Sequence, residues 1–263
     1  MRDLPLGWAT DLAILKLTGS KVEDRDDHLV VRTPDNPDYH WGNCLLVTDA
    51  SRVDDADAWV TRFEVAFPDA RWFAVGLPGM PAEVDAWARH GIELEQLDVL
   101  ATSTIPHAAP LAEGYVVRAL HDEDWSAVIE RDIAENIRTG EYDPVTHAPF
   151  VRARIAAQRR LCEEGAAQWF GAFWGDDLVA DLGIVRCGSI GRYQAVGTDA
   201  GHRRRGLASH LLGVAAAWSA DHGCSTWAIV TESTNDAGRV YRRAGFVLDQ
   251  AEVNAYRRPR LTT

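Results

Sequence analysis

The chain has 263 residues, of which 46% are hydrophobic, and a formal net charge of −12. This composition is typical of a globular protein with one large core or two modest ones, and the negative charge argues against general nucleic-acid binding. The N-terminal sequence MRDLP lacks the apolar core of a signal peptide, and no apolar run approaches the length of a membrane span. We therefore expect a cytoplasmic protein, a monomer or homodimer, that binds neither membranes nor nucleic acids.

The four cysteines give no sign of a metal site or a disulfide framework. Cys44, Cys162, Cys187 and Cys224 lie far apart, without a CxxC pair or a histidine at metal-ligand spacing. We expect reduced thiols that pack as small hydrophobic groups, and no bound metal.

The first part of the chain alternates between strand-like and helical runs. Residues 43–48 are strand-like, residues 56–67 helical and residues 71–75 again strand-like. A short helix then ends at Gly91, the residue best suited to a left-handed helix end, and the apolar run 94–100 follows.

Residues 103–110 contain two prolines and no hydrophobic period, which is typical of an extended connection. We place a domain boundary here, with one domain over residues 1–110 and a second over residues 111–263.

The second domain begins with a strand near residues 116–118. The most regular amphipathic helix follows, and its apolar face consists of Trp125, Val128, Ile129, Asp132, Ile133, Asn136 and Ile137. Residues 149–161 predict another helix, and residues 169–185 predict a hairpin with a turn at 175–177.

The remainder repeats the order of the first domain. Strand-like residues 193–198, helical residues 207–221, strand-like residues 226–230, a short helix ending at Gly245 and the run 247–256 follow in turn. Either the two domains are copies of one unit, or the similarity is the alternation common to α/β proteins.

The turn between residues 198 and 207 carries the strongest chemical signal. A strand leads into Arg203, Arg204, Arg205 and Gly206, and a helix begins directly afterwards. The start of a helix offers free N–H groups and the positive end of the helix dipole, so this turn can hold an anion. Alone, the arginine triplet would indicate no more than an exposed basic turn.

Two motifs resemble the GNAT superfamily of N-acetyltransferases. Arg203-x-x-Gly206-x-Ala208 is similar to its acyl-CoA signature, Q/R-x-x-G-x-G/A. The segment from Asn235 through Tyr241 to Phe246 is similar to N-x-x-A-x-x-x-Y-x-x-x-G-F, with Gly238 one place from the usual small residue. The resemblance covers the second domain well and the first in outline. It implies an α/β fold with a mixed (α+β) sheet, built from two GNAT-like acyl-CoA N-acyltransferase units in tandem.

The resemblance also implies a binding site for acetyl-CoA as co-substrate. The backbone of Val196 and Thr198 would pair with the pantetheine arm as an added strand, and Gly197 would permit a bulge or close backbone approach. N–H groups from Arg204 to Ser209 would hold the pyrophosphate. The expected cofactor-binding residues are Val196, Gly197, Thr198, Arg203, Arg204, Arg205, Gly206, Leu207, Ala208, Ser209, Asn235 and Tyr241.

For catalysis, the resemblance places Tyr241 near the thioester sulfur, where its hydroxyl could protonate the leaving thiolate. The amine also needs a base, and we expect Glu232 in that role because it follows an apolar strand. Asp199, Glu130 and Glu135 remain candidates for the base. His202 and His210 flank the loop, and we interpret them as polar rim residues.

The first domain lacks these features. Its loop, residues 49–55, has no glycine and places carboxylates where a pyrophosphate would sit, and Trp87 stands where the second domain has Tyr241. We therefore expect a degenerate GNAT-like unit that does not bind CoA but closes part of the substrate cleft. The rival interpretation is an unrelated regulatory domain.

The sequence thus predicts an N-acetyltransferase that moves an acetyl or other short acyl group to a primary amine of a small molecule by direct attack. The alternative is a non-catalytic acyl-CoA sensor or scaffold. Neither Cys162 nor Cys224 has a partner histidine for an acyl-enzyme route. Residues 139–144, between the first two helices of the second domain, are expected to shape the acceptor pocket.

Overall fold

Helices and strands alternate along most of the chain. The computed structural model describes residues 4–259, which we divide into a first half (4–110) and a second half (111–259). The helices are α1 Leu6–Leu17, α2 Ala56–Ala66, α3 Val84–Ala88, α4 Trp125–Thr139, α5 Pro144–Glu163, α6 Leu207–Asp221 and α7 Ala237–Arg243. The strands are β1 Lys21–Asp24, β2 His28–Arg32, β3 Cys44–Val47, β4 Phe73–Leu77, β5 Glu93–Thr102, β6 Tyr115–Ala119, β7 Ala167–Trp174, β8 Asp177–Cys187, β9 Ile190–Thr198, β10 Thr226–Glu232 and β11 Val247–Arg257.

The predicted order of elements is confirmed in both halves. The series β3–α2–β4–α3–β5 in the first half matches β9–α6–β10–α7–β11 in the second. Two details differ. Helix α5 begins at Pro144 rather than 149, because proline fits the first helical position and Asp143 caps the helix by accepting from Val145 N–H. Ile137, expected on the apolar face of α4, is 67% exposed.

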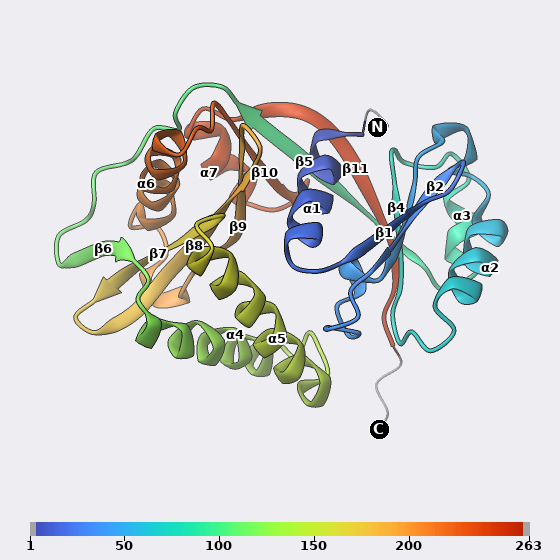
Figure 1. The fold of residues 1–263 in the computed structure, drawn as a ribbon, viewed down its shortest axis with the longest axis horizontal. Coiled ribbons are helices and arrows are strands. Elements are labelled where there is room, and N and C mark those ends of the chain that lie inside the picture. Colours follow the sequence, from blue (N-terminus) through green and yellow to red (C-terminus); the bar gives the residue numbers. More distant parts are fainter. Residues whose placement is uncertain (1–3, 260–263) are drawn as a thin grey trace.

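One mixed sheet runs through the described part of both halves. Its eleven strands lie in the order β1-β2-β3-β4-β11-β5-β10-β9-β8-β7-β6 (Figure 1). The last strand of each half has crossed to the other half: β5 pairs with β10 of the second half, and β11 pairs with β4 of the first. The two exchanged strands also pair with each other in antiparallel register. The exchange fixes the two halves to each other through backbone hydrogen bonds.

The hydrophobic cores follow this exchange. Val253 and Ala255 of β11 pack in the cluster of the first half, and Leu100 of β5 packs in the main cluster of the second half. A third cluster lies beneath α4 and α5 and includes the fully buried Trp169. Each half therefore completes its core with apolar residues from the other.

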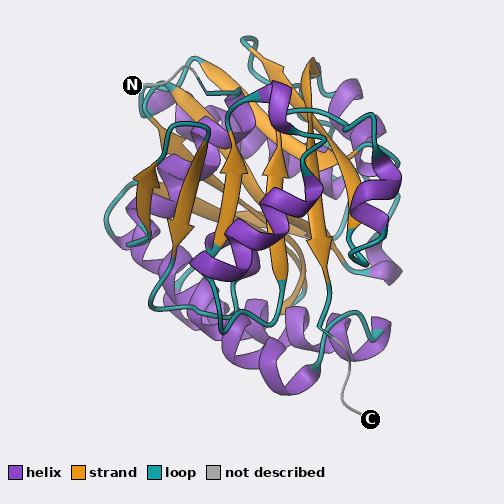
Figure 2. Cartoon of the chain, turned by 90° about the vertical axis from the view of Figure 1, so that its right-hand side faces the viewer, coloured by secondary structure: helices purple, strands orange, loops and turns teal. Residues whose placement is uncertain are grey.

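Helices cover both sides of the twisted sheet (Figure 2). In the second half, α6 and α7 lie on one side of the strands and α4 and α5 on the other (Figure 1). Helix α1 lies between the halves, where Arg192 of β9 donates to Thr10 Oγ1 at 3.2 Å and pairs with Asp11 at 3.0 Å. No helix within residues 4–259 has both the length and the apolar character to cross a membrane.

Gly183 of β8 offers a sharp test of the core packing. A Cβ atom at this position would lie 2.2 Å from Cε2 of the buried Trp169 ring, so Gly183→Ala forces the indole or the strand to move. We expect the free energy of unfolding, measured by urea titration, to fall by about 2 kcal/mol. Gly79→Ala is the control, since nothing lies within 4 Å of its added Cβ. Equal stability of the two variants would contradict the packing.

Candidate active site

Strands β9 and β10 separate partway along their length. They pair in parallel only where residues 190–192 face residues 226–228. Beyond Arg192, β9 remains paired with β8 on its other side, so the edge of β9 that faces β10 is free of strand partners from Tyr193 to Thr198. An open strand edge can pair with an extended ligand that carries amides.

A β-bulge increases this separation. The register between β8 and β9 shifts between Asp181 and Gly183, and Ala195 adopts a left-handed φ of 51°. The bulge therefore lies two residues before Gly197, not at it. Gly197 serves the close approach that was also expected, because an added Cβ would lie 3.1 Å from Nη2 of Arg131.

The turn after β9 leads to the open start of α6. Ala200–His202 form a 3₁₀ turn, Arg204 has a φ of 61°, and Gly206 has a φ of 78° at the N-cap position. No side chain hydrogen-bonds the helix start from this N-cap. The first-turn N–H groups are thus available to an anion, as predicted from the sequence.

The three arginines of the turn differ in their roles. All three side chains are exposed, but Arg203 donates from Nε to the carbonyl of Thr198 at 3.0 Å and lies 4.0 Å from Glu135. Arg203 therefore braces the turn against the end of β9. Within residues 4–259, Arg204 and Arg205 make no hydrogen bond or ion pair with the protein, as expected of cations at the rim of an anion site.

Both histidines of this region have structural partners. His202 Nδ1 lies 2.8 Å from the hydroxyl of Tyr115, and His210 Nδ1 lies 2.8 Å from the carbonyl oxygen of Ala109. The second contact holds the connection between the halves against α6. This agrees with the interpretation of both residues as polar rim residues.

A cavity of about 540 Å³ opens beside the bulge. Val196, Gly197, Thr198 and Arg203 from the predicted cofactor site line it, as do the candidate bases Asp199 and Glu135. The connection between α4 and α5 contributes Thr139, Glu141, Tyr142 and Asp143, so the segment 139–144 does line a cavity; that this cavity holds the acceptor stays a prediction. The first half contributes Asp38, Tyr39, His40, Trp41, Arg71 and Trp72.

A buried ion pair at the bulge was missed by the sequence reasoning. Arg131 of α4 forms an ion pair with Asp181 of β8, and Asp181 is only 1% exposed. Arg131 also lies 3.7 Å from the carboxylate of Asp199. A lone aspartate inside the apolar strand 178–185 was the available signal, because buried charges are kept only when they are paired. The pair fixes α4 against the bulge.

A second polar cluster, formed between α4 and α5, lines the same cavity. Asp132 of α4 pairs with His147 at 2.9 Å and with Arg154 at 2.5 Å, both from α5. Asp132 and Asn136 had been placed on the apolar face of α4, and both line the cavity. These two polar residues on an otherwise apolar helix face were thus the sequence signal that α4 lines a cavity.

The structure places the other predicted catalytic residues away from this cavity. Tyr241 is 5% exposed among core residues beside Phe246, and burial raises its pKa to about 12. Glu232 is exposed at the end of β10. Neither residue belongs to the cavity lining.

Asn235 has a structural role in this conformation. Its side-chain oxygen accepts from the backbone N–H of Ala237 at 2.9 Å, at the start of α7. Within residues 4–259, no group of three or more His, Cys, Asp or Glu residues is placed to hold a metal ion.

The loop of the first half that corresponds to the anion-binding turn is filled by its own side chains. Asp49 accepts from the N–H of Ser51 at 2.9 Å and from its hydroxyl at 2.7 Å, at the start of a 3₁₀ turn. Trp87, at the position that matches Tyr241, is fully buried and donates from Nε1 to the carbonyl of Val53. Neither residue is placed to meet a pyrophosphate.

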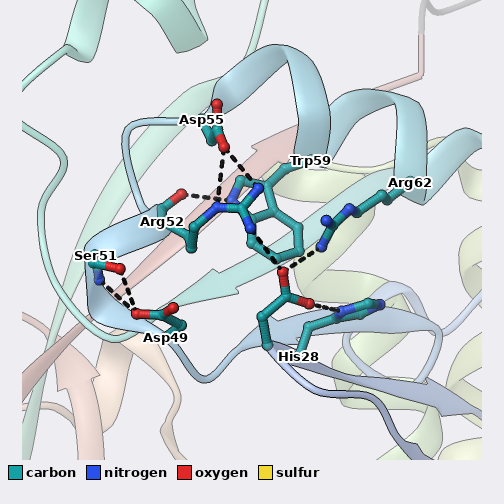
Figure 3. Close-up of polar contacts among 8 residues, drawn as sticks. His28, Asp49, Ser51, Arg52, Asp55, Trp59 and Arg62 are labelled. Atoms are coloured by element: carbon teal, nitrogen blue, oxygen red, sulfur yellow. Dashed lines mark hydrogen bonds and ion pairs between the residues drawn. The ribbon is translucent and has the colours of Figure 1, made fainter.

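The arginines near this loop are neutralised within the protein. Asp27 receives Arg62 at 2.7 Å, Arg52 at 3.2 Å and His28 at 2.7 Å, and Arg52 also pairs with Asp55 (Figure 3). The carboxylate of Asp27 thus neutralises the arginines that could otherwise bind an anionic ligand.

This cluster predicts a pH dependence of stability. Burial favours a raised pKa for Asp27, but hydrogen bonds from Arg62 and His28 outweigh it and lower the pKa from 3.8 to about 2. Because the folded-state pKa is the lower one, the contribution is fully present above about pH 4 and is lost as the pH falls towards 2. We expect Asp27→Asn to lower the free energy of unfolding by about 1–2 kcal/mol at pH 7, and by progressively less below pH 4.

Urea titrations of both proteins at pH 7 and pH 3 measure this difference. Asp26→Asn, one residue away on the exposed surface, is the control and should match the parent protein at both pH values. A loss for Asp27→Asn that does not shrink with acid would show that the ion pairs are not its cause.

Comparisons with known proteins agree with this geometry. Residues 131–246 match the model of the acetyltransferase (GNAT) family. The sequence has no match among the curated proteins.

Solved structures show the same fold over most of the chain. A GCN5-related N-acetyltransferase from Kribbella flavida is 15% identical with a TM-score of 0.65, and the match covers 96% of each chain. One from Sphaerobacter thermophilus is 19% identical with a TM-score of 0.63, covering 90% of this chain and 82% of the other. A tandem GNAT protein from the clavulanic acid biosynthesis pathway is 14% identical with a TM-score of 0.54, covering 93% and 85%.

The family match spans the separated strands β9 and β10, the open start of α6 and helix α7. The whole-chain structural similarity extends the fold across both halves, as in a tandem protein. Residues 131–246 of this chain therefore carry the acetyltransferase (GNAT) family domain.

Proposed function

We propose that this protein transfers an acetyl group, or another short acyl group, from acetyl-CoA to a primary amine of a small molecule. One observation carries the proposal: the free edge of β9, from Tyr193 to Thr198, leads directly into the open start of α6. The strand edge suits the amides of pantetheine, and the helix start suits the pyrophosphate. In this proposal, the backbone of Val196 and Thr198 binds the pantetheine amides, and the N–H groups of residues 204–209 bind the pyrophosphate.

The chemistry is a direct transfer. The amine nitrogen attacks the thioester carbonyl, the C–S bond breaks, and CoA leaves as a thiolate that takes a proton. Tyr241 supplies that proton in this proposal, as its place in the family-like segment 235–246 implies; burial raises its pKa to about 12, which keeps the hydroxyl neutral but makes it a weaker acid. The amine loses its own proton to a base.

The base is the open part of the proposal. Asp199 lines the cavity at the end of β9, whereas Glu232, our first expectation, does not. Glu135 also lines it, but a hydrogen bond from Arg138 lowers the pKa of Glu135 and weakens it as a base. Asp199→Asn, Glu130→Gln and Glu232→Gln separate the three remaining candidates: the variant of the true base loses kcat most strongly, and the loss shrinks as pH rises and more free amine is present.

The first half has a supporting role in this proposal. Six of its residues, from Asp38 to Trp72, line the cavity; in the turn that corresponds to the anion-binding turn of the second half, Asp49 accepts from Ser51, and Asp27 neutralises Arg52. We propose that it closes the acceptor side of the cleft without binding CoA, with the boundary between the domains near residue 110.

Free thiol release tests the activity. Protein, acetyl-CoA and single amines are mixed, and release is followed with a thiol reagent. Release that depends on the amine supports the enzyme, and an acetylated product identified by mass confirms the transfer. Tight CoA binding by calorimetry without release on a broad amine panel would favour the alternative, a non-catalytic acyl-CoA sensor.

A further inference from the structure

Aromatic rings from both halves form part of the wall of the 540 Å³ cavity. Trp72 and His40 of the first half stack with centroids 4.3 Å apart and planes within 13°. Tyr142 and His147 of the second half stack at 5.2 Å and 8°. Trp72 and Tyr142 join the two stacks, with centroids 5.7 Å apart, so the rings form one continuous surface across the two halves.

The stack of His40 and Trp72, on the side of the first half, is an uncharged aromatic surface. Burial, aided by the nearby charge of Arg258, lowers the pKa of His40 to about 4. His40 is therefore uncharged at neutral pH and does not repel a cation. The faces of Trp72 and Tyr142 carry the negative π-electron density that attracts cations and stacks with flat rings.

The charges of the same cavity select a cation. Seven carboxylates and four arginines line it, which leaves three negative charges in excess, and Arg258, outside the lining but near His40, offsets one of them. Each arginine already has a carboxylate partner in the lining: Arg71 with Asp143, Arg131 with Asp181, Arg154 with Asp132, and Arg203 with Glu135. The arginines are therefore not free to bind an acidic ligand, while the excess carboxylates attract an ammonium.

The cavity also joins the aromatic wall to the point of transfer. The same continuous lining that includes Trp72 and Tyr142 includes Val196 to Asp199 at the end of β9. Its volume is in the range of small-molecule sites, roughly 300–1,000 Å³. A ligand can thus contact the rings with one part and place its nitrogen at β9 with another.

We propose that the acceptor is a small primary amine that carries an aromatic ring on a short alkyl chain, and that the first half supplies Trp72 as the main surface for this ring. The proposal rests on the acetyltransferase function proposed above, because the amine is what that reaction consumes. It assigns the first half a role in choosing the substrate.

The test compares amines that differ in one property. 2-Phenylethylamine and 2-cyclohexylethylamine have the same charge and chain, but only the first has an aromatic face. Binding of each is measured by titration calorimetry to the full chain in the presence of CoA, so that no turnover is needed. We expect phenylethylamine to bind about three- to tenfold more tightly. Spermidine and an aminoglycoside are included as non-aromatic polycations.

Trp72→Leu connects the preference to the proposed wall. It should remove the difference between the two amines and leave the affinity for CoA unchanged. Trp218→Leu, on α6 and outside the cavity lining, is the matched control and should keep the preference. Thermal unfolding of both variants establishes that they remain folded.

The outcomes distinguish this proposal from the activity itself. Equal binding of the two amines, tighter binding of spermidine or the aminoglycoside, or a preference that survives Trp72→Leu overturns the aromatic acceptor. Preferential, Trp72-dependent binding supports it, both when phenylethylamine releases thiol and when no amine does. Release with other amines alone would keep the acetyltransferase and reject this acceptor.

Discussion

Gly206→Glu should abolish measurable CoA binding. In the proposed complex, the backbone at Gly206 meets the pyrophosphate, and a glutamate places both bulk and a like charge there. Calorimetry should show the Kd for CoA rising by about 100-fold or more. The fold should survive, because an added Cβ meets only Ala109 and Pro110 at ordinary distances of 3.7 and 3.9 Å.

Gly188→Glu is the matched control for this experiment. Gly188 lies in the β8–β9 turn with a φ of 66°, close to the 78° of Gly206, and nothing lies within 4 Å of its added Cβ. It therefore receives the same charge and the same left-handed strain, which costs about 1 kcal/mol, at a distance from the turn. CoA affinity that is undiminished in Gly206→Glu would reject the cofactor site; equal losses in both variants would mean that strain, not the site, is responsible.

The local elements of this fold could be predicted because their signals are local. Helix α6 begins and ends at the predicted residues, since an apolar stripe and a glycine start define it. Helix α1 was not predicted: its sequence, LGWATDLAILKL, has a weak one-sided pattern, because the helix is buried between the two halves.

The exchange of β5 and β11 could not be predicted from sequence. Both are apolar strands that follow a short helix, and either could pair beside β4 or β10. Strand partners are chosen by contacts far apart in the chain, which leave no periodic signal within a strand.

The sequence predicted the backbone turn of the candidate site, but it did not predict most of the side chains that line the cavity. The turn at Arg203–Gly206 follows from a motif, whereas the aromatic wall joins Trp72 to Tyr142, 70 positions apart, with no shared pattern. The local traces of the cavity were the connection at residues 139–144 and polar residues in apolar elements, such as Asp181.

Tyr241→Phe should lower kcat while leaving CoA binding intact. The hydroxyl is the proposed proton donor to the departing thiolate, and its pKa of about 12 keeps it protonated across the neutral range. Loss of a general acid typically costs about 100-fold or more in rate. Amine-dependent thiol release at saturating acetyl-CoA measures kcat, and calorimetry measures the affinity for CoA. Because phenylalanine keeps the ring, the packing beside Phe246 should be retained.

Tyr193→Phe separates catalysis from structure. Tyr193 is also a buried tyrosine of the second half, and its hydroxyl donates to the carbonyl of Leu212 at 2.7 Å. Its loss should lower the free energy of unfolding by about 1 kcal/mol with little change in kcat. Tyr241→Phe should show the reverse, with kcat lost and stability largely kept. If both variants lose stability and neither loses kcat, Tyr241 is a core residue and the proton comes from another donor or from water; if kcat falls only in Tyr241→Phe, the hydroxyl acts on the thiolate.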